Sequence, residues 1–467
     1  MQLFKEFSLA SSPREQLGSR LGFLLVSAGC AVGLGNVWRF PYITGKYGGA
    51  AFVLFYLIFL FLLGLPILVM EFSLGRAGRQ GIVGALKKLA PAGSWWPKFG
   101  YLAIFGNVML MMFYTTVAGW MLAYFVYMFK GDLAGLNPAQ VGDFFGSLLS
   151  RPGELSIWMG LVVFLGFWVC TTGLRQGVEK VSKLMMSGLF LILVALVIKA
   201  VSLPGAGKGI AFYLLPDFGK LAENGLGEVV YAAMGQAFFT LSLGIGAMTI
   251  FGSYIDKKRS LTGESLHIIL LDTLVAILSG LIIFPVCFAF DVDAGSGGGL
   301  IFITLPNVFN VMPGGRFWGA LFFLFLCFAA LSTVIAVFEN IIAFAMEQFG
   351  WSRKKSSLLC SLTVFFLSLP CVLGFNLFSS FQPLGPGTGI IDLEDFIVGN
   401  NLLPLGSLLL LIFCTSGRGW GWKGFVREAN EGVGVRFPVK LYLYLKYVLP
   451  LVMLLVFVGG YVEKFWK

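Results

Sequence analysis

Long apolar runs, separated by short polar connectors, recur along the chain from residue 21 to residue 462. About 20 consecutive apolar residues span the hydrocarbon core of a bilayer as a helix. Of the 467 residues, 58% are hydrophobic and 12% are charged, against roughly 45–50% and 25% in an ordinary soluble protein. This pattern excludes a water-soluble globule and predicts an all-α polytopic membrane protein.

The apolar runs divide the chain into eleven predicted spans. They cover residues 21–44, 48–74, 101–129, 155–173, 178–200, 226–254, 263–290, 316–348, 356–374, 393–416 and 442–462. No stretch between them has both the length and the polarity of a soluble domain. We therefore expect residues 1–467 to form a single transmembrane unit.

Lysine and arginine are distributed unequally between the two sets of connectors. With the N-terminus inside, 23 of the 33 fall on the cytoplasmic side, as the positive-inside rule requires. Residues 1–20 contain no apolar stretch of the signal-peptide type, so we expect them to be cytoplasmic, and an odd number of spans then leaves the C-terminus outside. Because the net charge of +10 is scattered over short connectors, it fits this orientation signal better than a nucleic-acid-binding patch.

Few features of the sequence support catalysis. The single histidine, His267, excludes an HExxH site or another multi-histidine metal centre. The chain contains no GxSxG motif and no nucleotide-binding loop. The seven cysteines lie one at a time in apolar runs, which fits buried apolar side chains better than disulfides. We therefore do not expect an enzyme.

Two spans carry glycine clusters that a continuous helix tolerates poorly. The first span contains AGCAVGLGNVWRFP (residues 28–41), and the sixth contains LSLGIGAM (residues 241–248). Each interior glycine costs a helix about 1 kcal/mol relative to alanine. Either cluster alone would also fit close packing of neighbouring helices. The two clusters occupy corresponding places in two five-helix halves, however, and paired interrupted spans indicate the binding site of a transporter.

Unwound backbone inside a membrane needs partners for its free N–H and C=O groups. The N-terminal end of a helix presents N–H groups to an anion such as a carboxylate, and free carbonyl oxygens coordinate small cations. A pair of broken helices therefore suits an amino acid and sodium together.

Arg39 is a charged residue within the first span, and it follows the break. A charge at the bilayer centre costs about 2.5–3.5 kcal/mol on insertion scales, so it calls for a partner. Natural candidates are the carboxylates near the outer start of the tenth span, Asp392, Glu394 and Asp395 in IIDLEDF (residues 390–396). Such a pair would act either as an outer gate or as a static tie between two helices.

Asp272 lies inside the seventh span with no Lys or Arg within ten residues, so we expect it to bind a cation or to carry a proton. Glu71 and Glu339 are expected to bond unwound backbone. The hydroxyls of Ser332 and Thr333 fit either a bond to a carbonyl one turn back or an oxygen cage for a monovalent cation, and the sequence does not choose between them.

The connector of residues 291–315 begins with a glycine-rich stretch and continues as LIFITLPNVFNVMP. It is too apolar for a free loop. We expect a hairpin that folds back over the outer mouth of the protein.

Three stretches closely resemble the neurotransmitter:sodium symporter family, in its bacterial eleven-helix amino-acid branch. They are RLGFLLVSAGCAVGLGNVWRFPYITGKYGGAAF (residues 20–52), QAFFTLSLGIGAM (residues 236–248) and FAALSTVIAVFEN (residues 328–340). The resemblance covers essentially the whole chain. It implies the LeuT-type fold, with two inverted five-helix repeats at about 21–200 and 226–416, an eleventh helix at about 442–462, and unwound first and sixth helices.

The same resemblance implies sodium-coupled symport by alternating access in a prokaryotic cell membrane, with two co-transported sodium ions and no organic cofactor. The first sodium ion would be held by Ala31, Asn36, Thr240 and Asp272. The second would be held by Gly29, Val32, Ala329, Ser332 and Thr333.

The resemblance also implies the substrate contacts and the gates. The substrate carboxylate would meet the backbone N–H groups of Leu34 and Gly35 and the hydroxyl of Tyr114, and its amino group would meet carbonyls at Ala31, Phe239 and Ser242. The side-chain lining would be Leu110, Tyr114, Phe239, Ser242, Ile245, Thr333 and Val337. The outer gate would be Arg39 with Asp395, covered by Phe239 and Tyr114, and the inner gate would involve Arg14, Tyr254 and Glu347.

Two departures from the family pattern narrow the expected function. Gly33 stands where monoamine transporters have an aspartate, which favours a substrate that brings its own carboxylate. The apolar lining favours a hydrophobic neutral L-amino acid, whether aliphatic or aromatic. Asp272 and Ala276 stand where chloride-dependent members have Asn and Ser, so the fixed carboxylate would supply the charge of chloride and we expect chloride-independent transport.

Two alternatives on the same fold stay open. One is a proton-coupled transporter with Asp272 as the carrier, and the other is a sensor that binds an amino acid without transporting it. The sequence also leaves open the oligomeric state and whether Asp272 returns protonated. The expected partners are the amino acid and the lipid bilayer, without nucleic acid.

Overall fold

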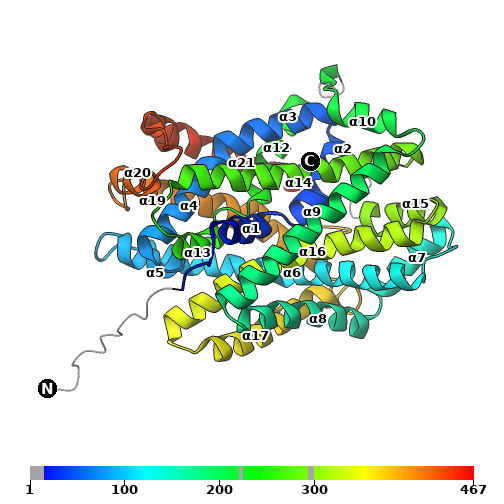
Figure 1. Ribbon diagram of the computed structural model, residues 1–467, viewed down its shortest axis with the longest axis horizontal. Coiled ribbons are helices and arrows are strands. Elements are labelled where there is room, and N and C mark those ends of the chain that lie inside the picture. Colours follow the sequence, from blue (N-terminus) through cyan, green and yellow to red (C-terminus); the bar gives the residue numbers. More distant parts are fainter. Residues whose placement is uncertain (1–14, 220–224, 293–298, 467) are drawn as a thin grey trace.

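The computed structural model describes residues 15–219, 225–292 and 299–466, and these are mainly helical (Figure 1). The helices of the first five spans and their connectors are α1 (Arg20–Ala31), α2 (Phe40–Lys46), α3 (Ala50–Phe59), α4 (Leu65–Gly78), α5 (Ile82–Leu89), α6 (Trp96–Lys130), α7 (Pro138–Leu149), α8 (Pro152–Thr171) and α9 (Lys180–Val201). The later helices are α10 (Ala206–Leu214), α12 (Leu226–Thr240), α13 (Ala247–Tyr254), α14 (Leu261–Ala289), α15 (Leu305–Val311), α16 (Gly315–Phe349), α17 (Arg353–Leu373), α18 (Ile390–Asp395), α19 (Leu403–Thr415), α20 (Trp422–Ala429) and α21 (Leu449–Phe465).

Nine helices in the described ranges are long and apolar enough to cross a bilayer, and α1 with the segment Gly35–Lys46 forms a bent pair that makes a tenth. α12 and α13, of 15 and 8 residues, are individually too short for this, but together they occupy the predicted sixth span. Helices therefore lie at each of the eleven predicted spans, and the all-α membrane fold is confirmed.

Both predicted interruptions are present. α1 ends at Ala31, and Val32 takes extended backbone before the π-helical turn η1 (Gly35–Arg39), so the two parts of the first span are bent by 55°. In the sixth span, residues 241–246 form turns in place of a helix. Gly244 and Gly246 have positive φ angles of 93° and 69°, which glycine adopts without a steric penalty.

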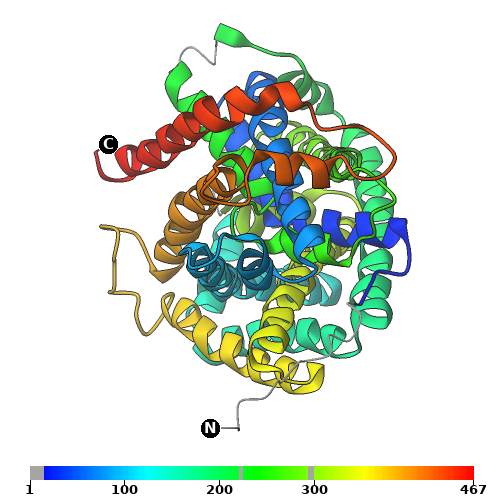
Figure 2. The ribbon, with the colours of Figure 1, turned by 90° about the vertical axis from the view of Figure 1, so that its left-hand side faces the viewer.

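The long helices lie side by side along one axis of the molecule, and Figure 2 looks along that axis. The predicted inner connectors that contain α5 and α20 lie at the left-hand end of Figure 1, whereas the predicted outer connectors that contain α7 and α15 lie at the right-hand end. The arrangement therefore agrees with the two sides that the charge distribution predicts.

Small residues allow α4 and α13 to pack closely. A Cβ atom added to Gly75 would lie 1.8 Å from the carbonyl oxygen of Thr249, and one added to Gly252 would lie 2.5 Å from the carbonyl oxygen of Phe72. Membrane helices associate through such small-residue faces. α13, the part of the sixth span that follows the break, is thus packed directly against α4 of the second span.

The apolar segment that begins at Leu300 packs onto the protein as predicted. Leu300, Ile301 and Phe302 are buried, and the Phe302 ring contacts the rings of Trp38 and Trp120 at centroid distances of 6.0 and 5.6 Å. Most of the glycine-rich beginning of the predicted hairpin, residues 293–298, lies outside the described residues.

A fully buried arginine, Arg76, anchors the C-terminal end of α4, which the charge distribution predicts to be cytoplasmic. Arg76 Nε donates to Glu428 Oε1 of α20 at 2.7 Å, and its Nη1 donates to the Arg259 carbonyl at 2.7 Å. Arg76 Nη2 also donates to the backbone carbonyl of Glu428. Lys257 adds a second cation 3.3 Å from Glu428. The connector that contains α20 is therefore fixed to the ends of the second and sixth spans.

Candidate functional site

The two helix breaks face one another in the middle of the bundle. Gln236 Nε2 of α12 donates to the Gly35 carbonyl at 2.9 Å, so the end of α12 lies beside the start of η1. Glu71 of α4 satisfies the unwound sixth span from the other side, because its two carboxylate oxygens accept the N–H groups of Gly244 and Met248 at 2.7 and 3.0 Å. The prediction that Glu71 bonds unwound backbone is confirmed.

The predicted first sodium site is built around Asp272 of α14. Asp272 Oδ1 accepts Asn36 Nδ2 at 2.9 Å, and Oδ2 accepts the Thr240 hydroxyl at 3.1 Å. Both partners are uncharged, and all three side chains are buried. Ala31, the fourth predicted ligand, lies at the end of α1. A carboxylate buried in this way gains most from a bound cation, since neither hydrogen-bonding partner supplies positive charge.

The residues of the predicted second sodium site also lie close together. The Thr333 hydroxyl of α16 lies 3.2 Å from the Gly29 carbonyl and 3.2 Å from the Val32 carbonyl of the first span. It lies 3.4 Å from the carbonyl of Ala329, and the Ser332 hydroxyl lies 2.9 Å from that same carbonyl. All five predicted residues therefore lie together, and their oxygen atoms are the ligands that hard cations prefer.

No group of three or more His, Cys, Asp or Glu that could hold a metal ion exists within the described ranges. A site for zinc or a similar transition metal would need such a group. The carboxylate, amide, hydroxyl and carbonyl oxygens of the two clusters are ligand types that a monovalent cation can use.

A small cavity of about 20 Å³ lies between the two breaks. Its lining contains eight of the ten predicted substrate residues, namely Ala31, Leu34, Gly35, Leu110, Tyr114, Phe239, Ser242 and Thr333. The lining also includes Gly33, the position used above to infer the substrate class, and Leu403, which the substrate prediction missed. Ile245 and Val337 are buried but do not line the cavity.

The cavity holds no more than about one water molecule in this conformation. The Leu34 N–H and the Tyr114 hydroxyl, both predicted to bind the substrate carboxylate, bond each other instead. The N–H donates to the hydroxyl at 3.2 Å, and this bond closes the wall of the cavity. Ser242 has φ 50°, a left-handed conformation that strains a residue with a side chain. A ligand larger than a water molecule could therefore enter this cavity only if the wall opened.

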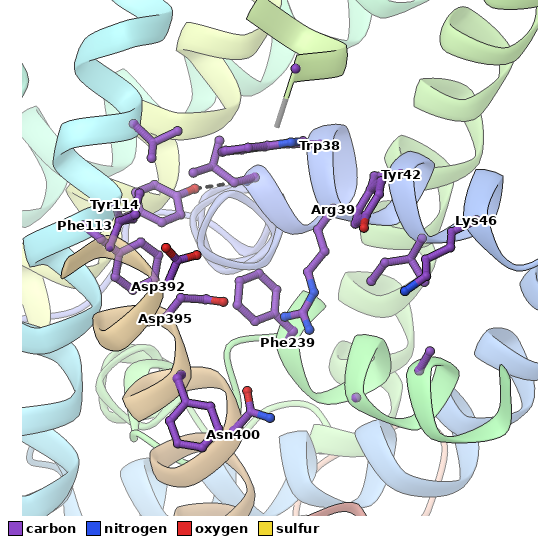
Figure 3. Close-up of a pocket in the computed structure, with 18 of the residues that line it drawn as sticks. Trp38, Arg39, Tyr42, Lys46, Phe113, Tyr114, Phe239, Asp392, Asp395 and Asn400 are labelled. Carbon is purple, nitrogen blue, oxygen red and sulfur yellow. Dashed lines mark hydrogen bonds between the residues drawn. The ribbon is translucent and has the colours of Figure 1, made fainter. Parts of the chain in front are cut away.

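A second, much larger cavity of about 860 Å³ adjoins the small one (Figure 3). Leu34, Tyr114 and Phe239 line both cavities, so these three residues form the partition between them. We call the larger cavity the outer vestibule, because it lies on the side that the charge distribution places outside. Gly299 at the start of the apolar outer segment is part of its lining.

The predicted outer-gate residues, Arg39 and Asp395, both line the outer vestibule. The Arg39 guanidinium carbon lies 4.3 Å from the centroid of the Phe239 ring. Figure 3 shows that ring between Arg39 and the Asp395 carboxyl group. Across the described residues, no ion pair joins Arg39 to Asp395. The fold brings the two charges to one cavity but leaves them apart in this conformation.

Two of the three predicted inner-gate residues, Tyr254 and Glu347, lie in the described part of the chain and bond groups of neighbouring elements. The Tyr254 hydroxyl donates to Glu339 at 2.8 Å, and Glu339 pairs with Arg353 at 2.7 Å. Glu347 accepts the Gly81 N–H with both carboxylate oxygens at 3.0 Å. Arg14 lies outside the described residues.

Sequence reasoning was wrong about Glu339 and missed two asparagines. Glu339 bonds Tyr254 and Arg353 in place of unwound backbone, because the start of α17 brings a guanidinium to it. Asn107 of α6 and Asn340 of α16 are fully buried and bond the unwound sixth span. Each could have been found in the sequence as a polar amide inside an otherwise apolar span, which needs a hydrogen-bonding partner there.

Comparison with known proteins agrees with this geometry. The model of the sodium:neurotransmitter symporter family matches residues 14–141 and 140–464. A protein of Bacillus subtilis, described as an uncharacterized sodium-dependent transporter, is 34% identical over 444 residues, which cover 95% of this chain and 97% of the relative. A sodium-dependent transporter of Haemophilus influenzae is 32% identical, over 96% of this chain and 98% of the relative.

Among solved structures, the crystal structure of MhsT in complex with L-phenylalanine superposes with a TM-score of 0.85 at 37% sequence identity. The match covers 96% of this chain and 100% of that one. A serotonin transporter of Drosophila melanogaster is more distant, at 29% identity over 82% of this chain.

Proposed function

The chain belongs to the sodium:neurotransmitter symporter family, and on that basis we propose that it couples the inward movement of sodium to the uptake of a hydrophobic neutral L-amino acid. Its relatives are sodium-dependent transporters and not enzymes, and it is a multi-pass membrane transporter. In our proposal the substrate binds between the two helix breaks with two sodium ions, and alternating access moves all three.

We base the sodium coupling above all on the buried Asp272 carboxylate, held by Asn36 and Thr240. A cation bound there would offset the cost of burying the charge, and the substrate carboxylate would be its second anionic partner. Support for a second ion comes from the oxygens that surround the Thr333 hydroxyl. Sodium binding and substrate binding would thus stabilise one another, which is the physical basis of coupling.

The geometry at Gly33 supports an amino acid as the substrate. A Cβ atom at this position would lie 2.4 Å from the Tyr114 hydroxyl and 2.7 Å from the Thr333 hydroxyl. An aspartate, which monoamine transporters of the family carry here, therefore has no room in this conformation. The L-phenylalanine bound by MhsT and the apolar side chains of Leu110, Phe239 and Leu403 favour an apolar substrate side chain.

Chloride independence is supported by the surroundings of Asp272. Ala276 lies one turn further along α14, is fully buried and carries no hydroxyl group that could bind an anion. The Asp272 carboxylate would supply the negative charge that chloride provides in chloride-dependent relatives.

We also propose that the protein lies in the cell membrane with its N-terminus in the cytoplasm and its C-terminus outside. Val433, in the connector after α20, is 79% exposed and would then face the cytoplasm. A cysteine introduced by Val433→Cys should react with a membrane-impermeant maleimide in inside-out vesicles and stay unlabelled in intact cells. Labelling in intact cells would contradict this proposal and indicate the opposite orientation.

The function can be tested with the purified protein in proteoliposomes. Uptake of labelled L-phenylalanine and L-leucine would be measured with an inward gradient of sodium or of potassium, each with chloride or gluconate, and with unlabelled amino acids as competitors. We expect uptake only with sodium, unchanged by gluconate, and inhibited by apolar amino acids. Uptake driven equally well by a proton gradient without sodium would contradict sodium coupling. Sodium-dependent binding without accumulation would indicate a sensor.

A further inference from the structure

Three buried side chains, Asn107, Asn340 and Glu71, bond the unwound part of the sixth span beside the small cavity. Asn107 Nδ2 donates to the Ile245 carbonyl at 2.7 Å and to the Ala103 carbonyl at 2.8 Å. Asn340 Nδ2 donates to Asn107 Oδ1 at 3.1 Å and to the Gly246 carbonyl at 3.4 Å. Together with Glu71, these asparagines join α4, α6 and α16 to backbone groups between Gly244 and Met248.

Ile245 does not line the small cavity, but it packs beside α6 close to the inner side of the cavity. A Cβ atom added to Gly106 of α6 would lie 2.7 Å from Ile245 Cγ2, so the isoleucine side chain packs directly against that turn. Leu110, one helical turn further along α6 toward the outside, lines the cavity itself. Ile245 is therefore positioned to block the space below a substrate side chain.

We propose that Asn107 and Asn340 are positioning residues that set the largest substrate side chain the transporter accepts, because they bond the carbonyl groups of Ile245 and Gly246 and so fix the peptide groups on either side of Gly246. This inference rests on the proposed function. A long side chain could enter only if Ile245 moved inward, and that movement would break the bonds that the two amides donate. The limit on size thus comes from the cost of leaving buried carbonyl groups unpaired.

The orientation of the Asn340 amide agrees with this role. Its nitrogen reaches both available acceptors, while its oxygen is buried and has no hydrogen-bonding partner in the described structure. A buried acceptor without a partner lowers stability. The Asn340 amide is therefore oriented so that its nitrogen bonds Asn107 and the Gly246 carbonyl, while its own oxygen is left without a hydrogen bond.

The test is a selectivity measurement with the full-length protein in detergent. Sodium-dependent binding of labelled L-phenylalanine would be competed with L-valine, L-leucine and L-tryptophan in wild type, Asn340→Leu and Asn107→Leu. Leucine nearly preserves the volume of asparagine and donates no hydrogen bond. We expect the tryptophan-to-valine ratio of inhibition constants to fall about tenfold in each variant, of the order that one or two methylene groups produce in an apolar pocket.

Ile245→Ala is an independent third variant, because it shortens the blocking side chain without touching either amide. The same shift toward tryptophan is expected. Asn310→Leu is the matched control: Asn310 donates one bond to the Leu136 carbonyl near the outer connectors, and its loss should leave the ratio unchanged.

The ratio separates a positioning role from a general structural one. A variant that weakens binding of all competitors by the same factor, or leaves the ratio unchanged, would overturn the inference while leaving the proposed function intact. Should wild type bind none of these amino acids with sodium present, the proposed function and this inference would both fail.

Discussion

The Arg39 guanidinium lies over the Phe239 ring, 4.3 Å from its centroid, at the partition between the two cavities. A cation placed over an aromatic ring is stabilised by about 0.5–2 kcal/mol, according to how far the pair is desolvated. The ring thus holds Arg39 in the open vestibule, with Asp395 across the same cavity. When the vestibule closes over a substrate, Arg39 would exchange the ring for the carboxylate.

The first prediction concerns this exchange. Asp395→Asn should weaken amino-acid binding about tenfold, or about 1.4 kcal/mol, because the occluded state loses one ion pair. Sodium binding in the absence of substrate should stay close to wild type, because the open state does not contain the pair. Equilibrium binding of labelled amino acid and of sodium would measure both. Asp143→Asn, an exposed carboxylate on α7, is the control, and equal affinities in the two variants would exclude an Asp395 gate.

The second prediction follows from the space at Gly33. Gly33→Ala should reduce amino-acid binding at least about tenfold, because the added methyl group must displace the Tyr114 or the Thr333 hydroxyl. Gly207→Ala adds the same methyl group on α10 with no atom within 4 Å and should leave binding unchanged. Wild-type affinity in Gly33→Ala would show that neither hydroxyl positions the substrate.

The third prediction concerns anion use at Asp272. Asp272→Asn should weaken sodium-dependent binding in chloride-free buffer by at least about tenfold, since the fixed negative charge beside the ion is lost. The double variant Asp272→Asn with Ala276→Ser should regain part of the affinity when chloride is added. Sodium titrations in chloride and in gluconate would measure both effects. Asp132→Asn, at an exposed outer position, is the control. Unchanged binding in gluconate would contradict the proposed role.

The fourth prediction concerns the C-terminal end of α4. Glu428→Ala leaves the fully buried Arg76 guanidinium without its counter-charge, so the folded protein should lose about 3–5 kcal/mol. Thermal unfolding of the detergent-purified protein would show a lower melting temperature. Asp256→Ala breaks an exposed pair with Lys258 instead, which should cost no more than about 1 kcal/mol. Similar melting temperatures in both variants would mean that α20 is not anchored through this pair.

Much of the fold could be predicted because it follows from local properties of the chain. A run of apolar residues forms a membrane helix wherever it occurs, so each of the eleven spans was located without knowledge of its neighbours. The break in the sixth span could likewise be predicted from Gly244 and Gly246, because glycine readily adopts conformations that interrupt a helix. Both residues lie in the break with positive φ. The lining of the small cavity followed from family resemblance, and only Ile245 and Val337 fell outside it.

Partnerships between buried polar groups could not be predicted in this way. Glu339 was assigned to unwound backbone, yet it bonds Tyr254, which is 85 positions away. Asn107 and Asn340 are 233 positions apart and share one hydrogen bond beneath the cavity. Arg76 and Glu428 are separated by 352 positions. Nothing near each residue in the sequence identifies such partners, because the bundle brings them together.

The sequence by itself determined that this chain crosses a membrane, where its helices lie and which two of them break, and it singled out Asp272 as a membrane carboxylate expected to bind a cation or to carry a proton. These properties depend on residue type and on near neighbours along the chain. Only the tertiary structure decided how the oxygens of α1, α14 and α16 converge, that the outer vestibule is open, and that Arg39 lies over Phe239. Those features depend on distances of a few ångströms between helices, which packing of the whole bundle sets.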